Sequence, residues 1–340
     1  MTDKGRTIYG FIQGEEPRRF GPMGIDGREV YTLSYEGVSA LVSRTLEAFD
    51  DLPKETLLRN LTVYQSAIEK VMNEHPVIPV KFGTLLEEDE GVIRMLKRGK
   101  DQIVQSLEDV GDRIELDVVA FWPDMKAVLA EIGQTDEIKT LKENTATETE
   151  ADVLEMRIKA GKRVKALLDQ KREAIKSVII PPLLGIAEKH AVHSLMDDAM
   201  IMNAAFLINR GDAARLEGVV AGLDRHFEDR INFRIIGPMP TYSFRTFEIK
   251  TADHVQLDNA RKMLELDEET TQEEIRDKYW QLTKKFHPDK FPGDRETQKH
   301  FEKINQAYNI VTDYCQAPSC SFREKDVKNW VSVTAVGSSD

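Results

Sequence analysis

His287, Pro288 and Asp289 form a compact polar tripeptide whose side chains could take part in recognition chemistry. An imidazole and a carboxylate held beside a rigid proline can offer both a hydrogen bond and a charge to another molecule. Pro288 disfavours helical backbone angles at His287 and cannot continue an amide ladder, so a helix arriving from upstream ends here. We therefore expect Asp289 to lie in a loop, which Phe291-Pro292-Gly293-Asp294 extends.

The sequence on both sides of this tripeptide has the apolar periodicity of an amphipathic helix. Thr271 and Glu274 have the spacing of a capping box, which predicts a helix that begins near Gln272. The two stripes can face each other in an antiparallel hairpin that holds the tripeptide at its tip. Their members are Ile275, Tyr279, Leu282 and Phe286 upstream, and Phe301, Ile304, Tyr308 and Val311 downstream.

The cysteines are the first residues to consider for metal or redox chemistry. The chain has only Cys315 and Cys320, too few for a disulfide framework, so we expect reduced thiols. His287 or His300 could join them on a zinc ion, but a structural zinc site needs two regularly spaced pairs. The cysteines therefore predict no metal centre.

Two other groups have residue types found in active sites. His190 and His193 are three residues apart on a possible helix, but no nearby cysteine completes a metal site, so we expect solvated or capped histidines. The acids of 87–90 fall in the first turn of an expected helix, where carboxylates complement the helix dipole. The sequence predicts neither a metal nor a cofactor.

The hairpin and its tripeptide resemble the J-domain of DnaJ-type co-chaperones. The resemblance runs over about sixty residues, from a short helix at 260–264 to Phe301-Glu302-Lys303-Ile304-Asn305-Gln306-Ala307-Tyr308. In that family the loop aspartate docks on a DnaK-type heat-shock chaperone and promotes its ATP hydrolysis, a role that the resemblance implies for Asp289. The chaperone-binding residues it implies are His287, Pro288, Asp289, Arg276, Lys278 and Lys285.

This segment departs from the J-domain pattern in its charge. Trp280 and Gln281 stand where Lys or Arg is common in the family, and Asp277 subtracts from the neighbouring positive charge. Residues 257–313 hold ten Lys and Arg against thirteen Asp and Glu, a net charge of −3. Long-range steering toward an acidic groove should therefore be weak, and docking slower or more selective. Residues 315–318 replace the family's usual Gln-Lys-Arg ending, which puts its last short helix in doubt.

Composition limits the partners of the whole chain. Its 340 residues carry a net charge of −12, and no block of Lys and Arg is longer than two residues, which argues against nucleic acid and anionic membranes. The longest apolar run, 178–187, contains Pro181 and Pro182 and is too short to span a bilayer. The first residues are unlike a signal peptide, so the expected location is the cytoplasm.

The residues before the hairpin predict alternating strands and helices. Strands are expected at 7–13, twice within 30–42, and at 77–82, 114–121, 200–209 and 232–237. Helices are expected at 54–73, 87–107, 152–177 and 213–227. The polar stretch 134–151 is typical of a connector between domains.

Three segments of this region resemble gas vesicle proteins of the GvpF/GvpL type. They are 79–84 (Pro-Val-Arg-Phe-Gly-Thr in the family, with Lys81 replacing arginine here), 112–122, and 237–244 (Gly-Pro-Trp-Pro-Pro-Tyr-Ser-Phe in the family). Met239 and Thr241 depart from the last motif. The family-motif residues are Pro79, Lys81, Phe82, Gly83, Thr84, Gly237, Pro238, Pro240, Tyr242 and Phe244. Lys81 lies on an otherwise apolar strand, so its cation must find a carboxylate or leave the core.

The expected fold is α+β. Two α/β units with mixed or antiparallel sheets, the second ferredoxin-like, precede a small all-α J-domain hairpin. The expected domains are an N-terminal α/β domain at 1–133, a connector and long charged helix at 134–177, a second α/β domain at 178–250, a linker at 251–256, the J-domain at 257–316 and a flexible tail at 317–340.

The two resemblances together imply a gas vesicle assembly factor or minor structural component. It would bind the small hydrophobic shell protein and other gas vesicle proteins, and its J-domain would recruit a DnaK-type chaperone. The alternative is a general J-domain co-chaperone whose α/β region binds clients unrelated to gas vesicles. An enzyme is not expected, because the sequence has no nucleophile elbow, phosphate-binding loop, dinucleotide fingerprint or paired metal motif.

Overall fold

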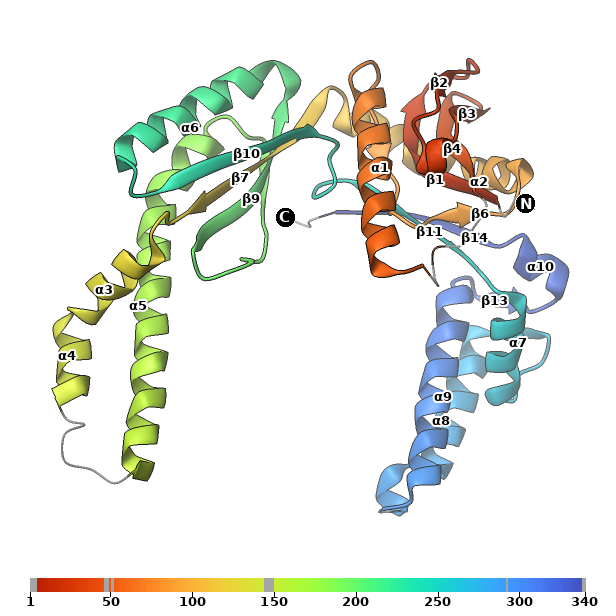
Figure 1. Cartoon of the computed structure of the whole chain (residues 1–340). Coiled ribbons are helices and arrows are strands. Elements are labelled where there is room, and N and C mark those ends of the chain that lie inside the picture. The colour runs from red at the N-terminus through yellow and green to blue at the C-terminus, as the bar shows by residue number, and fades with distance from the viewer. Residues whose placement is uncertain (1–4, 46–48, 50–51, 144–149, 292, 338–340) are drawn as a thin grey trace.

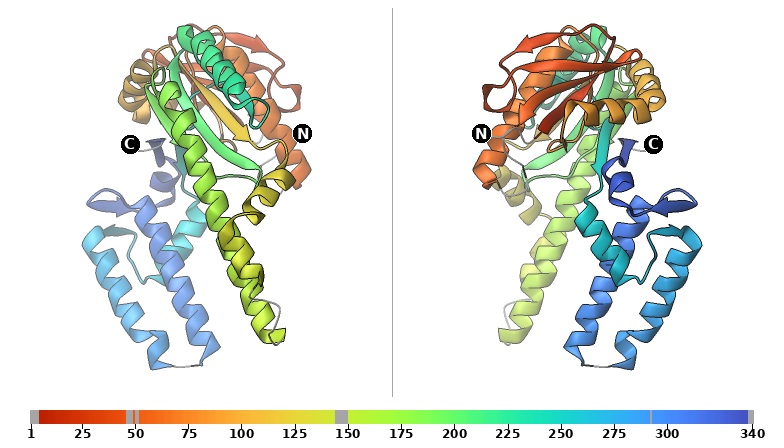
Figure 2. Two further views of the ribbon diagram at one scale, coloured as in Figure 1. Left: turned by 90° about the vertical axis from the view of Figure 1, so that its left-hand side faces the viewer. Right: turned by 90° about the vertical axis from the view of Figure 1, so that its right-hand side faces the viewer.

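The structure, a computed structural model, describes residues 5–45, 49, 52–143, 150–291 and 293–337. The described residues form two main β-sheets flanked by helices and a helical C-terminal unit (Figure 1). The long helix α5 (Glu150–Leu184) and the hairpin of α8 (Gln272–Lys285) and α9 (Arg295–Tyr314) extend from the sheets toward the same side of the molecule (Figures 1 and 2). This architecture confirms the expected α+β class.

The first sheet is antiparallel and buried on both faces. Its order is β2-β3-β4-β1-β5, and β6 also pairs with β1. In β4, Val38, Ala40 and Val42 face one hydrophobic core and Leu41 faces the other, as the alternation of a strand requires. Helix α1 (Lys54–Met72) packs on the Leu41 face and α2 (Asp89–Val110) on the opposite face. The strands are β1 (Gly5–Gln13), β2 (Arg19–Gly21), β3 (Val30–Tyr35), β4 (Val38–Thr45), β5 (Ile78–Pro79) and β6 (Leu85–Leu86), with a 3₁₀ turn at Ile25–Gly27.

The second sheet has the ferredoxin-like topology that the sequence predicted. Its antiparallel order, β10-β7-β9-β8, is that of a β-α-β-β-α-β unit in which α5 and α6 (Ala213–Phe227) are the crossover helices. The predicted boundary at residue 133 is wrong, because β7 pairs with β9 and β10 rather than with the first sheet. The strands are β7 (Arg113–Phe121), β8 (Lys189–Val192), β9 (Met200–Asn209) and β10 (Asn232–Met239), with a 3₁₀ turn at Arg210–Asp212.

The connector and the charged helix pack beside the second sheet. Helices α3 (Met125–Gly133) and α4 (Asp136–Glu143) contact α5. Helix α5 continues past the predicted end at 177, through Pro181 and Pro182, because Ile179 and Leu183 are fully buried in the core of the second sheet. Apolar burial therefore stabilises the last turns despite the amides that the prolines lack.

The helical C-terminal unit has its own core, and it confirms the predicted hairpin. Thr271 and Glu274 form the capping box, and α8 ends at Lys285. The two apolar stripes meet in a core in which Ile275, Ile304 and Val311 are almost fully buried. Helix α7 (His254–Met263) packs against α9, and a 3₁₀ turn (Pro288–Lys290) carries the tripeptide between α8 and α9.

Residues 319–336 are ordered, so the predicted flexible tail is wrong over this range. β13 (Ser319–Ser321) pairs with β12 (Glu269–Thr271), and after α10 (Glu324–Lys328) strand β14 (Val331–Val336) pairs with β11 (Thr246–Thr251). The alternation of Val331, Val333 and Ala335 with polar residues explains β14, whose apolar side chains pack on the core of the first sheet. Residues 338–340 lie outside the described part of the chain.

Two smaller predictions in this region are also wrong. The linker at 251–256 is only Ala252–Asp253, since Thr251 ends β11 and His254 begins α7. Cys315 and Cys320 are joined by a disulfide rather than reduced, because the turn into β13 brings their Cα atoms to 5.5 Å. Among the described helices, none is long and apolar enough to cross a membrane.

Candidate functional sites

The predicted tripeptide lies at the exposed end of the α8–α9 hairpin. The His287 Nδ1 atom accepts a hydrogen bond from the Asp289 amide at 3.3 Å and lies 3.5 Å from Asp289 Oδ2. The imidazole also contacts the Phe301 ring edge-on, with 5.7 Å between ring centroids. The Asp289 side chain is 88% exposed, so its charge faces solvent and is available to a partner.

The basic residues predicted to accompany the tripeptide do not form one continuous stripe. Arg276 and Trp280 follow one row of α8, and Lys278 and Lys285 follow another. Lys278 Nζ lies 4.0 Å from a Glu265 carboxylate, which offsets part of its charge. Trp280 is 70% exposed, so this surface of α8 presents a large aromatic side chain among scattered cations.

The segment 79–84 joins β1 of the first sheet to β11. Lys81 donates its backbone amide to the Phe247 carbonyl at 2.8 Å, and its Nζ donates to Glu248 Oε1 at 2.9 Å. The Lys81 cation thus lies outside the core and also pairs with a carboxylate. The sequence had predicted one of these two outcomes without indicating which. The predicted strand 77–82 shortens to β5, since beyond Pro79 the chain turns at Gly83, whose φ is +91°. Phe82 packs against Tyr64, with ring centroids 5.2 Å apart.

We expect Lys81→Met to lower the free energy of unfolding by less than about 1 kcal/mol at pH 7, as exposed ion pairs do. The hydrogen bond from Lys81 holds the pKa of Glu248 below its usual 4.5. The stabilisation from this pair is therefore complete above pH 4.5 and is lost as the pH falls through the lowered folded-state value. Urea unfolding at several pH values should show the difference from wild type shrinking in acid, whereas Lys126→Met on exposed α3 should show no such trend. A loss for Lys81→Met that is constant with pH would contradict this assignment.

The segment 237–244 closes against β7. Gly237 has φ +126°, and a side chain here would meet the Glu115 carbonyl oxygen at 2.8 Å, so only glycine fits this close approach. Phe244 is buried against Ala205 and Leu207 of β9. Tyr242 packs on the core of the second sheet, and its hydroxyl is buried without a partner among the described residues. Burial raises the pKa of this phenol.

Ser243, between these two aromatic residues, binds a buried carboxylate that sequence reasoning missed. Its amide donates to Glu115 Oε2 at 2.8 Å, and its hydroxyl donates to Glu115 Oε1 at 2.7 Å. Glu115 is only 2% exposed, and burial raises the pKa of its carboxyl to about 7, although the hydrogen bonds from Ser243 oppose the shift. The segments 112–122 and 237–244, noted separately in the sequence, thus meet at this contact.

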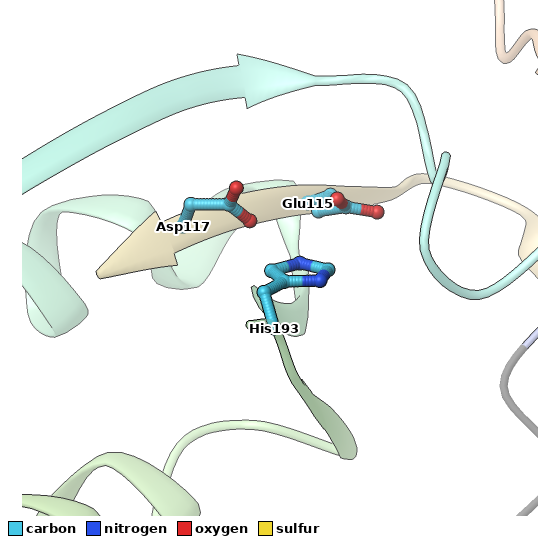
Figure 3. Close-up of side chains that lie close together, drawn as sticks. All are labelled: Glu115, Asp117 and His193. Carbon is cyan, nitrogen blue, oxygen red and sulfur yellow. The ribbon is translucent and has the colours of Figure 1, made fainter. Parts of the chain in front are cut away.

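Asp117 and His193 lie beside Glu115 (Figure 3). Burial raises the pKa of Asp117, and the nearby His193 imidazole opposes that shift. The two histidines do not lie on a helix: His190 is exposed on β8, as expected of a solvated histidine, whereas His193 follows β8 and its Nε2 is 3.2 Å from the Ser243 hydroxyl. A sequence signal existed: Glu115 and Asp117 are two apart in an otherwise apolar strand, which places both on one face.

Comparisons with known proteins divide the chain in two. Residues 5–246 match the family of the gas vesicle synthesis protein GvpL/GvpF, and residues 261–316 match the DnaJ domain. Gas vesicle protein F of a Streptomyces species is 26% identical over 243 residues, which cover 70% of this chain and 98% of the relative. Chaperone protein DnaJ of Finegoldia magna is 46% identical over 55 residues, which are 16% of this chain and only 15% of the relative.

A solved structure supports the fold of the front part. The crystal structure of the gas vesicle protein GvpF from Anabaena superposes with a TM-score of 0.59 at 24% identity, and the match covers 71% of this chain and 97% of that one. At this identity the likeness concerns the fold. The strand β14 lies outside both matched segments, so the β11–β14 ladder that joins the two parts is not accounted for by either family match.

Proposed function

The chain belongs to the GvpL/GvpF family of gas vesicle synthesis proteins and carries a DnaJ domain, and from that premise we propose that it is a chaperone-recruiting factor for gas vesicle assembly. Its front units bind the small hydrophobic shell protein, and its J-domain brings a DnaK-type chaperone to that client. It acts through binding rather than catalysis, in the cytoplasm and in association with gas vesicles.

The observation that carries this proposal is the exposed Asp289 carboxylate on a hairpin that the β11–β14 ladder joins to residues 5–246. The turn that carries Asp289 joins α8 to α9 at the end of the hairpin that is farther from the sheets (Figure 1). The ladder of β11 and β14 connects the hairpin to the first sheet. A client bound to the front units would therefore remain close to any chaperone docked at the tip.

Selective retention of the shell protein tests the proposal. The immobilised full chain should retain the small shell protein in preference to unrelated hydrophobic proteins of similar size. The His287→Gln variant should retain it equally well, since the tip is distant from the front units. Equal retention of all the hydrophobic proteins would instead support the alternative, a general J-domain co-chaperone with clients unrelated to gas vesicles.

A further inference from the structure

Glu115, Asp117 and His193 converge on one face of the second sheet. Glu115 and Asp117 follow each other on that face of β7, and His193 comes just after β8, two strands away. In β9 between them, Ala205 lies opposite Asp117 and also opposite Ala191 of β8. Figure 3 shows the His193 ring beside the two carboxylates.

The geometry of the three side chains suits a common ion. One ligand atom from each lies within 4.8 Å of the other two. The Oδ1 atom of Asp117 is buried and has no hydrogen-bond partner among the described residues. Such an orphaned acceptor is costly unless something that the protein chain does not supply completes it.

The charge of the cluster also calls for a cation. Two carboxylates are drawn out of water here, yet among the described residues no Lys or Arg forms an ion pair with either one. Ser243 supplies two hydrogen bonds to Glu115 but no charge. His193 is the one basic side chain in the cluster, and a divalent ion would balance both acids.

We propose that Glu115, Asp117 and His193 bind one divalent transition-metal ion of the zinc type. One imidazole nitrogen and two carboxylate oxygens suit zinc better than magnesium or calcium, which favour all-oxygen sites. Three protein ligands leave a fourth position for water. Ser243 would not bind the metal itself, but its two hydrogen bonds orient the Glu115 carboxylate.

This ion would fasten together parts of the chain that are distant in sequence. It would link β7 directly to the turn after β8, and through Ser243 it would hold segment 237–244 against β7. Segment 237–244 leads directly into β11, so the metal would stabilise the passage from the second sheet to the ladder that carries the hairpin.

Metal titration of the full-length chain without a histidine tag tests this site. After treatment with a chelator and dialysis, the wild type should bind one equivalent of Zn²⁺ and should unfold at a higher temperature with Zn²⁺ than without it. Co²⁺ should produce visible absorption bands on binding. Asp117→Asn and His193→Ala should each weaken Zn²⁺ binding at least about tenfold, and Ser243→Ala should weaken it about tenfold through its contact with Glu115.

His190→Ala is the matched control. His190 lies three residues earlier, and its ring stacks on Phe206, on the opposite face of the sheet from the cluster. This variant should bind Zn²⁺ as the wild type does. Circular dichroism identifies any variant that fails to fold. If Asp117→Asn or His193→Ala does not fold, the Zn²⁺ affinity of Ser243→Ala is compared with that of the wild type instead. Failure of the folded wild type to bind Zn²⁺, or equal binding by His193→Ala and His190→Ala, would overturn the proposal.

Discussion

Replacing Asp289 with asparagine is expected to reduce the stimulation of a cognate DnaK-type ATPase at least about tenfold, a loss of about 1.4 kcal/mol in coupling. The Asp289 carboxylate is 88% exposed; its backbone amide donates to His287 Nδ1 at 3.3 Å, and its Oδ2 atom lies 3.5 Å from the same nitrogen. Asparagine keeps the shape and the amide but removes the charge, so folding should change by less than about 0.5 kcal/mol. Single-turnover ATP hydrolysis with and without the variant measures the effect.

The control for this variant changes the same charge elsewhere on the hairpin. Asp277→Asn removes an exposed carboxylate from α8, away from the tip, and should leave stimulation unchanged or slightly raised. Because the segment 257–313 has a net charge of −3, added salt should reduce the wild-type stimulation only weakly. If the two asparagine variants behave alike, the tip of the hairpin does not couple to the ATPase and the proposed recruitment is wrong.

A chain that ends at Trp330 is expected to lose about 3 kcal/mol or more of its free energy of unfolding. Val331 is 5% exposed, and burial of one such side chain stabilises by about 1.5–3 kcal/mol. Val333 and Ala335 pack on the same core, and β11 loses its partner over six residue pairs. The bare β11 edge should also promote aggregation. Urea unfolding measures the loss of stability, and amide exchange along β11 measures the exposure of its edge.

A pair of glycine variants separates strand packing from shortening of the chain. An alanine Cβ at Gly99 of α2 would lie 2.6 Å from Val333 Cγ1, so Gly99→Ala should cost about 1–3 kcal/mol in the full chain. In the chain that ends at Trp330 this clash is absent, and the same variant should be neutral or stabilising. Gly218→Ala in α6, where nothing lies within 4 Å, should stabilise both chains by about 0.5–1 kcal/mol. A constant effect of Gly99→Ala in the two chains would contradict the packing of β14 on α2.

Local patterns predicted the C-terminal hairpin well. The capping box at Thr271, the stop at Pro288 and the apolar stripes depend on interactions between residues a few positions apart, which the sequence displays directly. The strand and helix pattern of residues 200–237 predicted β9, α6 and β10 of the second sheet, but β8 was not predicted as a strand. The membership of β7 in this sheet was not predicted either, because both faces of this strand are largely buried and its partners lie 79 or more residues downstream.

The candidate metal site was missed for the same reason. Glu115 and Asp117 are visible as two acids in an apolar strand, but no local pattern predicts that His193 and Ser243 contact that strand. Strand β14 was missed although its apolar alternation was visible, because its short length after a polar segment favoured a tail. The disulfide depended on the turn into β13, which spacing alone did not predict.

The attachment of the hairpin through two strands has a mechanical consequence. The chain enters the helical unit from β11 and leaves it into β14, and these two strands pair with each other. The helical unit is therefore attached at two points and cannot rotate freely about a single linker. A chaperone docked at Asp289 would therefore have a fixed orientation relative to the front units. It would lie on the side of the molecule toward which α5 also extends (Figure 2). Its encounter with a client held on the same molecule would become a local event, at an effective concentration in roughly the millimolar range, rather than a search through the cell.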